Sequence, residues 1–253
     1  MAEKAILIDV AKCTGCRACQ VACKQWNRLP AEKTKNRGTY ENPPDLSAHT
    51  WNRIKFNEVL EDGELKWLFF NDRCRHCEYP PCKDAADEVV PGAIIKDKTG
   101  AVVFTEKTKK LNFSDIRDAC PFDIPRYDKT SGRIYKCTLC IDRTTNGLEP
   151  ACVKACPTGT LNFGDKSAMV KLANKRVKEL GGKASFYPSD EYNIFWVLPE
   201  AEGYYNLAKA PETLPGKISL ANLFGSWGSL GMASALLGFV ASRLNQRKGT
   251  TEG

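Results

Sequence analysis

The residues whose types and spacing could do chemistry in this sequence are its twelve cysteines, which all lie between Cys13 and Cys156. One run has the spacing C-x-x-C-x-x-C-x-x-x-C and consists of Cys13, Cys16, Cys19 and Cys23. Another has the spacing C-x-x-C-x11-C-x-x-x-C-P and consists of Cys137, Cys140, Cys152 and Cys156. A tight loop can supply three thiolates to a 4Fe-4S cluster, but it seldom supplies the fourth. The spacing therefore predicts iron-sulfur chemistry.

The two runs together predict two interlocked clusters. In the bacterial ferredoxin arrangement, the fourth cysteine of each run crosses to the other cluster. The first ligand set expected from this crossing is Cys13, Cys16, Cys19 and Cys156. The second set is Cys23, Cys137, Cys140 and Cys152. Pro157 directly follows Cys156 and suits the end of a loop, because proline fixes φ and lacks an N–H.

The remaining four cysteines look like an incomplete pair of runs. Crossed ligation makes them one complete third set, which is Cys74, Cys77, Cys82 and Cys120. The fourth site of a complete pair would use positions now held by Ala86, Lys110, Phe113 and Ile116. One crossed set is thus whole and the other is wholly absent. The sequence therefore predicts three 4Fe-4S clusters and leaves no thiol over.

Two other uses of the cysteines compete with iron. C-x-x-C pairs also hold zinc, and twelve cysteines could form six disulfides. Zinc does not account for a triplet at two-residue intervals that is followed by a fourth cysteine. Disulfides would require closely spaced neighbours to reach six separate partners. Iron-sulfur ligation is the interpretation that explains all twelve.

The formal charge of +7 would ordinarily suggest an anionic partner. Each cluster with its four thiolates carries a charge of about −2, so three clusters bring the loaded protein near neutrality. We therefore expect no nucleic-acid partner.

The segment from Ile218 to Ala241 contains no charged residue and is followed by Arg243, Arg247 and Lys248. A helix of this length reaches about 36 Å, enough to cross a bilayer core of about 30 Å. We expect a transmembrane anchor over 218–241, with a buried helix or an apolar tail on a partner subunit as alternatives. The basic flank predicts a cytoplasmic C-terminus and a cysteine-rich body on the periplasmic side of a bacterial inner membrane. Since the first residues do not resemble a signal peptide, we expect export with a partner, the alternative being a cytoplasmic protein.

A strand, a cysteine loop and a short helix recur along the chain, which predicts an α+β fold. Strands are expected in AILIDV, KWLFFND, GAVVF, GRIYK and EYNIFWVL, and helices in SDIRDAC, capped by Ser114, and in the amphipathic stretch 165–182. The fold expected is two interleaved ferredoxin-like subdomains, one with a single cluster, and a C-terminal extension that ends in the membrane helix. The expected parts are 1–50 with 127–165, which hold two clusters, 51–126, which hold one, the extension and linker 166–217, and the anchor 218–241.

Several residues beside the cysteines are candidates for secondary roles. The cations Lys24, Arg75, Lys136 and Arg143 could favour electron-rich clusters, or could simply be solvated. His76 lies within C-x-H-C, and we expect it to donate to sulfur or contact a partner rather than ligate metal. The residues expected in the core or at a subunit interface are Trp26, Trp51 and Trp67. We expect no catalytic residues, since the sequence has no Ser-His-Asp set, phosphate loop or dinucleotide fingerprint.

The motifs CTGCRACQVACKQWN, CRHCEYPPC, ACPFDIPRYD, KCTLCIDR and ACVKACPTGTL resemble the iron-sulfur electron-transfer subunits of molybdopterin oxidoreductases. That family supplies the small subunits of formate dehydrogenases, respiratory nitrate reductases and dimethyl sulfoxide reductases. The resemblance covers roughly residues 4–165. The usual member has four clusters, and the missing set makes this chain most similar to the three-cluster small subunit of tungsten or molybdenum formate dehydrogenases.

The resemblance implies a one-electron relay without bond chemistry. It implies a large molybdopterin or tungstopterin catalytic subunit near the first two clusters, and an exit through the third. The acceptor would be a cytochrome or quinone-linked membrane subunit, or a soluble cytochrome. Other oxidoreductases, such as a sulfur-compound reductase, a nitrate reductase or a hydrogenase, are alternatives, because the substrate is chosen by the partner. A zinc-bearing, membrane-anchored interaction protein is a further alternative from a different class.

Overall fold

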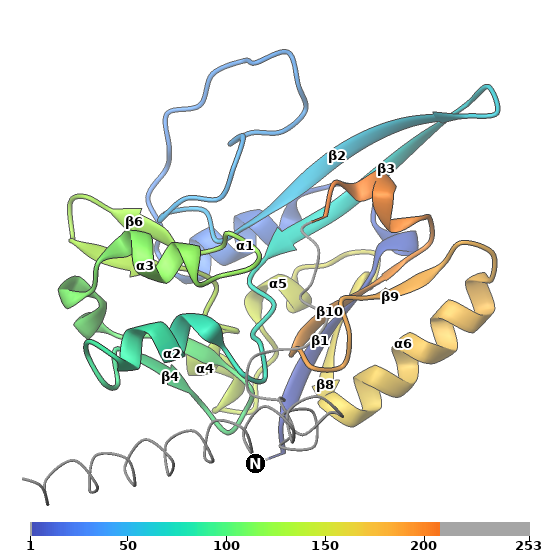
Figure 1. Cartoon of the computed structure of the whole chain (residues 1–253). Helices are drawn as coiled ribbons and strands as arrows, with labels where there is room; N and C mark the ends of the chain where they lie inside the picture. The colour runs from blue at the N-terminus through green and yellow to red at the C-terminus, as the bar shows by residue number, and fades with distance from the viewer. Residues whose placement is uncertain (1, 208–253) are drawn as a thin grey trace, which may run out of the picture. The chain divides into compact units, whose positions relative to one another are not determined.

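A four-stranded sheet with one covering helix organises the computed structural model, which describes residues 2–207 (Figure 1). Its strands, in spatial order, are β8 (Leu161–Asp165), β1 (Lys4–Asp9), β10 (Ile194–Leu198) and β9 (Ser185–Tyr187). β1 pairs in parallel with β10 and antiparallel with β8. The strand from the expected C-terminal extension, β10, therefore lies inside the sheet beside the N-terminal strand.

The central strands are apolar along their whole length because both of their faces are buried. All five residues of β10 are buried, as are five of the six residues of β1. α6 (Lys166–Leu180) covers one face of the sheet, where its Ala173 and Met169 pack with Leu7, Phe195 and other apolar residues. The helix ends before Gly181, whose φ of +65° favours glycine.

A long antiparallel hairpin joins β2 (Asn52–Glu61) to β3 (Glu64–Arg73) and extends away from the sheet (Figure 1). Asp62 and Gly63 form its two-residue turn, with φ of 53° and 81°. Asp-Gly with two positive φ angles is the pair that a tight hairpin turn favours. The turn end of the hairpin is exposed, while the opposite end is buried and leads directly into Cys74. The hairpin thus brings the end of β3 among the cysteine loops.

Short elements make up the rest of the described chain. The helices are α1 (Ala18–Trp26), α2 (Pro81–Asp87), α3 (Phe113–Asp118), α4 (Ile141–Thr144) and α5 (Ala151–Lys154). The strands pair as β4 (Ile94–Lys96) with β5 (Val102–Phe104) and β6 (Arg126–Asp128) with β7 (Arg133–Tyr135). Single 3-10 turns are η1 (Val10–Lys12), η2 (Glu106–Lys110) and η3 (Glu202–Tyr205).

The five expected strands and two expected helices are all present, with one correction and one omission. The N-cap of α3 is Asn112, not Ser114, because the Asn112 side chain accepts a hydrogen bond from the Ser114 N–H. β2 was not expected, since its apolar residues do not alternate regularly. The mixed α and β content agrees with the expected fold class.

An apolar core occupies the positions where a fourth ligand set would stand. Ala86 and Ile116 are 0% and 1% exposed, and Phe113 packs against them from a partly buried position. Lys110 is exposed and lies outside this core. The core also contains Ile94, Val102, Leu111, Ile134 and the cysteine Cys82. Three of the four positions that would hold the absent ligands are therefore occupied by side chains that pack in this core. The exception is Lys110.

No helix within residues 2–207 has the length and apolar character needed to cross a bilayer. The expected anchor over 218–241 lies outside the described residues.

The packing of Ile116 yields a first prediction. Ile116→Ala removes buried methyl groups from the apolar core and should lower the free energy of unfolding by about 2–5 kcal/mol. Anaerobic thermal unfolding followed by circular dichroism measures this as a lower Tm, by roughly 2–4 °C for each kcal/mol. Ile95→Ala is the matched control, because Ile95 is 45% exposed on β4 and its loss should cost less than about 0.5 kcal/mol. An equal decrease in Tm for Ile116→Ala and Ile95→Ala would contradict the burial of Ile116 in the apolar core.

Candidate iron-sulfur sites

Two short helices carry the cysteines that cross between the first and second sets. α1 presents Cys19 and Cys23 one turn apart, on a buried face that packs against α5. Cys152 on α5 and Cys156 just beyond it are also four residues apart. Cys19 and Cys156 line one cavity, whereas Cys23 and Cys152 line another. Helix geometry thus separates each pair in the manner that the crossed pattern requires.

The cysteines of the first set surround one cavity. Cys13, Cys16, Cys19 and Cys156 line it, together with Asn71, Thr158 and neighbouring loop residues. The loop that carries the first cysteines needs Gly15, whose φ is +67° and whose added Cβ would lie 2.9 Å from the Phe69 ring. Cys16 is exposed, and it is the most accessible thiol among the described residues.

The cysteines of the second set surround a separate cavity. Cys23, Cys137, Cys140 and Cys152 line it, together with Ile6, Trp51, Arg73 and loop residues. Leu139 and Cys140 both adopt positive φ angles, 57° and 48°, which curl the chain tightly around the space. All four thiols of this set are buried. The lining of this cavity therefore groups Cys23 with three cysteines of the distant run.

The third set also comes together, although it lines no described cavity. Cys77 and Cys82 have both Cys74 and Cys120 among their main electrostatic neighbours. The backbone N–H of His76 donates a hydrogen bond of 3.4 Å to the Cys74 Sγ atom. Cys120 is the half-buried member of this set, and the other three thiols are buried.

Burial opposes ionisation at most of these thiols, so something must compensate for the charge of a thiolate. Burial raises the pKa of Cys19 and of Cys140 to about 12, and it raises the pKa of Cys82 well above its usual value. Cys156 is the exception: burial raises its pKa, but backbone N–H donors at Leu161 and Thr158 outweigh this effect and lower it. Iron binds thiolates and not thiols, and it deprotonates a coordinating thiol outright. Four thiols around one cavity, with N–H donors aimed at sulfur, are a donor set that fits a 4Fe-4S cluster.

The described residues contain no group of three or more His, Cys, Asp and Glu side chains arranged to hold a single metal ion. His76 is fully buried, and its Nδ1 atom accepts a hydrogen bond of 2.9 Å from the Val102 N–H. Burial and the positive charge of Lys136 lower the pKa of His76 well below its usual value, so this imidazole is neutral.

The second set lies next to both of the others, since α1 carries Cys19 of the first set and Cys23 of the second, and Arg73, directly before Cys74 of the third set, donates to Cys152. The charge of Cys152 in the second set raises the pKa of Cys19 in the first. The charge of Cys74 in the third set acts in the same way on Cys137 in the second. The second set is therefore the electrostatic neighbour of both others.

Sequence reasoning missed two residues at the sites, Arg73 and Asn71. Arg73 donates to the Cys152 Sγ atom at 3.2 Å, and Asn71 donates to the Cys19 Sγ atom at 3.1 Å. Neither lies inside a cysteine motif, although Arg73 directly precedes Cys74. The four cations expected at the clusters differ among themselves. Lys136 is buried and lowers the pKa of Cys82, whereas Lys24 binds the Glu32 carboxylate and nearby oxygens.

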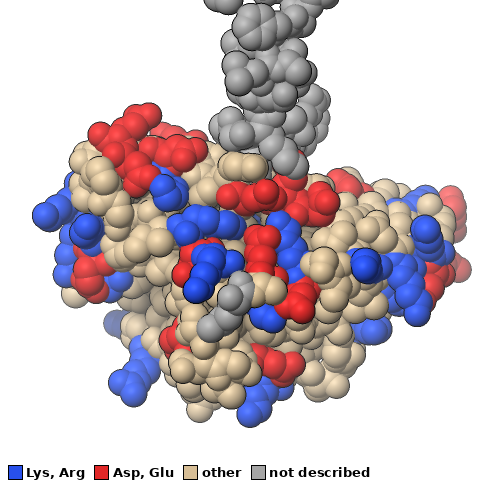
Figure 2. Space-filling view, turned by 90° about the horizontal axis from the view of Figure 1, so that it is seen from below, with Lys and Arg blue, Asp and Glu red and all other residues tan. Residues whose placement is uncertain are grey.

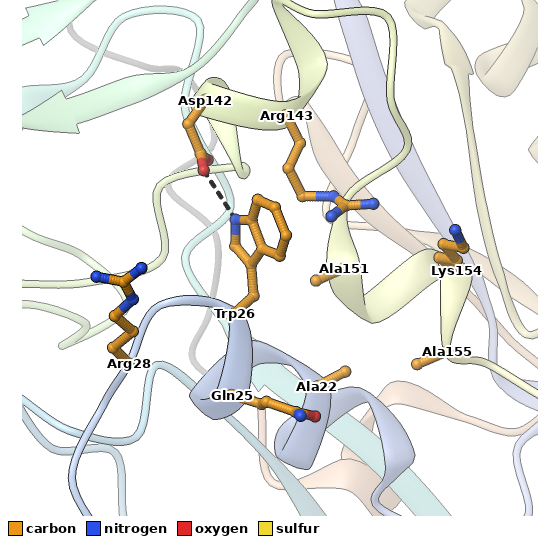
Figure 3. Close-up of a pocket in the computed structure, with 9 residues that line it drawn as sticks. All are labelled: Ala22, Gln25, Trp26, Arg28, Asp142, Arg143, Ala151, Lys154 and Ala155. Carbon is orange, nitrogen blue, oxygen red and sulfur yellow. Dashed lines mark hydrogen bonds between the residues drawn. The ribbon is translucent and has the colours of Figure 1, made fainter.

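A groove of about 640 Å³ lies between α1, α4 and α5, beside the second set (Figure 3). The Trp26 Nε1–H donates to the Asp142 carboxylate at 2.8 Å, and the Arg143 guanidinium lies 4.1 Å from the Trp26 ring centroid. Trp26 is 43% exposed and Trp67 is 46% exposed, whereas Trp51 is buried. The first two have the exposure expected of interface residues, and Trp51 belongs to the core.

Basic and acidic side chains are interspersed over the face shown in Figure 2. Ion pairs also bring the two signs together elsewhere in the described chain, as where Lys166 lies within 3.5 Å of Glu3 and within 3.3 Å of Glu78. The described residues of this face therefore present no broad field of a single sign.

Comparisons with known proteins agree with this geometry. Residues 65–166 match the family model described as a 4Fe-4S dicluster domain. The chain is 48% identical over 210 residues to formate dehydrogenase 2 subunit beta (cytochrome c-553) of Nitratidesulfovibrio vulgaris, a match that covers 80% of this chain and 96% of that subunit. It is 46% identical over 216 residues to the formate dehydrogenase subunit beta of Megalodesulfovibrio gigas, with 82% and 100% covered. It is 40% identical over 252 residues to the iron-sulfur subunit of the nitrate-inducible formate dehydrogenase of Escherichia coli, with 95% and 82% covered. The chain therefore belongs to the family of formate dehydrogenase iron-sulfur subunits.

Proposed function

We propose that this protein is the electron-transfer subunit of a formate dehydrogenase and relays electrons through three 4Fe-4S clusters. The observation that carries the proposal is the row of three four-cysteine groups, in which the second group adjoins the other two. The family match to formate dehydrogenase subunits supports the reaction of the complex. The proposed ligands are the three cysteine sets defined above.

The exposure of the thiols marks two ends at which partners could approach, and the family resemblance implies which partner belongs at each end. Cys16 is exposed in the first set, and Cys120 is half buried in the third. We assign the end at Cys16 to a pterin-containing catalytic subunit and the end at Cys120 to the acceptor. A cytochrome is a suitable acceptor, in keeping with the name of the N. vulgaris relative.

The chain's own residues hold the redox groups and set their surroundings. The clusters supply one-electron redox chemistry when bound, with potentials set by burial, charge and hydrogen bonds to sulfur. The backbone N–H of His76 donates to a ligand sulfur, and the buried aliphatic residues around the second set exclude water. Such donors and neighbouring cations favour the more negative, reduced state.

We propose a division of the chain according to the clusters that each part holds. Residues 1–50 with 127–165 form the subdomain for two clusters, and residues 51–126 form the subdomain for one. The core that contains Ala86 and Ile116 supports a single site in the second subdomain. Residues 166–217 form the extension, which adds β10 to the central sheet.

We further propose that residues 218–241 anchor the protein in a bacterial inner membrane, with its body on the periplasmic side. The apolar segment and the basic residues after it support this topology. The match to the E. coli subunit covers 95% of this chain and therefore extends into residues 218–253.

The function predicts both metal content and response to formate. A complex purified anaerobically through this chain should contain about twelve iron atoms per chain and absorb near 400 nm. Formate should bleach this absorption as dithionite does, because electrons reach the clusters through the catalytic partner. Fewer than ten irons would contradict three clusters, and bleaching by dithionite without bleaching by formate would contradict the formate reaction.

Crossed ligation predicts that a cysteine introduced at position 86 cannot replace Cys120. Cys120→Ser should remove or alter the third cluster alone, leaving about eight irons per chain or a changed third spectroscopic signal. Adding Ala86→Cys to this variant should not restore the wild-type signal, because Ala86 lies in the apolar core. Electron paramagnetic resonance of the reduced complex measures both effects. Recovery in the double variant would mean that a thiol at position 86 reaches the third site, which would contradict the separation of this position from that site.

The proposed anchor predicts a change in partitioning. Deletion of residues 218–253 should move the complex from the membrane fraction to the soluble fraction without loss of iron. Fractionation with detergent-free washes and iron analysis measures this. Full-length complex that is already soluble without detergent would rule the anchor out.

A further inference from the structure

Arg73 is a fully buried cation that forms no ion pair with Asp or Glu within residues 2–207. It ends β3, one residue before the first cysteine of the third set. A buried charge without a counter-charge lowers the stability of the folded state by several kcal/mol. The guanidinium group must therefore be compensated by something other than a carboxylate.

The contacts of Arg73 identify that compensation. Its NH1 group donates to the Cys152 Sγ atom at 3.2 Å, and its Nε–H donates to the Asn71 Oδ1 atom. The Asn71 amide in turn donates to the Cys19 Sγ atom at 3.1 Å. Its NH2 group is buried and forms no hydrogen bond within the described residues. These hydrogen bonds form a continuous bridge from the first set, at Cys19, to the second set, at Cys152.

The electrostatic influence of Arg73 extends to both sets. Burial raises the pKa of Cys19 and Cys137, and the positive charge of Arg73 is the largest electrostatic effect that opposes this rise. Burial also works against the charge of Arg73, but the nearby cysteines outweigh it and raise the Arg73 pKa. The guanidinium therefore stays protonated throughout a redox cycle.

Arg75 and Arg53, two buried arginines near Arg73 in the chain, differ from it in their partners. Arg75 pairs with the Asp72 carboxylate at 2.9 Å, and Arg53 forms ion pairs with Glu41 and Asp45. Their charges are thus largely balanced within the protein. Arg73 alone among these three has sulfur and an amide as its described partners.

We propose that Arg73, oriented by Asn71, is a positioning residue that stabilises an added electron on either of the first two clusters and keeps their reduction potentials high and close together. This proposal rests on the cluster assignment proposed above. When an electron passes between these clusters, one is oxidised and the other reduced by one electron. No covalent bond forms or breaks, and no proton moves, because Arg73 keeps its charge.

Three substitutions in the intact complex separate charge from hydrogen bonding. Arg73→Gln removes the charge but keeps an N–H donor. Arg73→Lys keeps the charge but loses the planar fork. Asn71→Asp places a carboxylate against the guanidinium and removes the donor to Cys19. Redox titration followed by electron paramagnetic resonance gives each cluster's potential. Cys16→Ser, Cys140→Ser and Cys120→Ser identify the signal of the first, second and third cluster, respectively.

The expected pattern differs between the variants. Arg73→Gln should shift the reduction equilibria of the first and second clusters by about tenfold toward oxidation, which is about 59 mV for one electron. Arg73→Lys should produce a smaller shift, largest at the second cluster, which loses its bond at Cys152. Asn71→Asp should affect the first cluster most, since it loses the bond at Cys19. The potential of the third cluster should change least in all three.

Arg53→Gln is the matched control, because Arg53 is buried, paired with carboxylates and has no described contact with a ligand sulfur. It should leave all three potentials unchanged. Wild-type potentials in both Arg73→Gln and Asn71→Asp, or equal shifts in the Arg53→Gln control, would overturn the proposal. If Arg73→Gln does not assemble, Asn71→Asp decides, since it preserves size and the arginine. Absence of cluster signals from the wild-type complex would instead overturn the proposed function.

Discussion

The need to bring four thiolates to each site from two distant stretches of chain governs the rest of this structure. α1 satisfies half of that need, because its Cys19 and Cys23 lie one turn apart and face different cavities. α5 and the loop after it satisfy the other half with Cys152 and Cys156. The two helices must pack together for either site to close. The surrounding sheet, which joins β1 to β8 and β10, places the two cysteine runs side by side.

Burial of so many sulfur atoms creates an electrostatic problem that the fold answers locally. Thiolates in a low-dielectric interior are costly, and burial accordingly raises the pKa of Cys23 and Cys82. Backbone N–H groups, the amide of Asn71 and the cations Arg73 and Lys136 all offer positive charge to the sulfur atoms. Asn71 and Arg73 come from outside the cysteine motifs. Both lie at the buried end of β3, so the β2–β3 hairpin brings them to the sulfur atoms.

The cysteine spacing contains enough information to predict which thiols gather, because ligation restricts the loops more strongly than local propensity does. The strands near the cysteines were also predictable, since each is a short apolar run that leads into a loop. Arg73 and Asn71 could not be found in this way. An arginine that precedes a cysteine is usually solvated, and only the pairing of β3 with β2 buries it. The place of β10 in the central sheet depends on a contact with β1 that spans most of the chain, and no local pattern specifies such a contact.

The absent fourth set bears on where electrons leave the protein. Ala86 and Ile116 pack with Cys82 in one apolar core. The third set therefore lies against apolar side chains at the place where a further cluster would otherwise be expected. Electron transfer weakens steeply with distance, and this core holds no redox group among its described residues. An acceptor on the far side of the core would be separated from the proposed third cluster by several packed side chains. In the proposed ligand set Cys120 is the least buried cysteine, which favours an acceptor that docks directly at that residue.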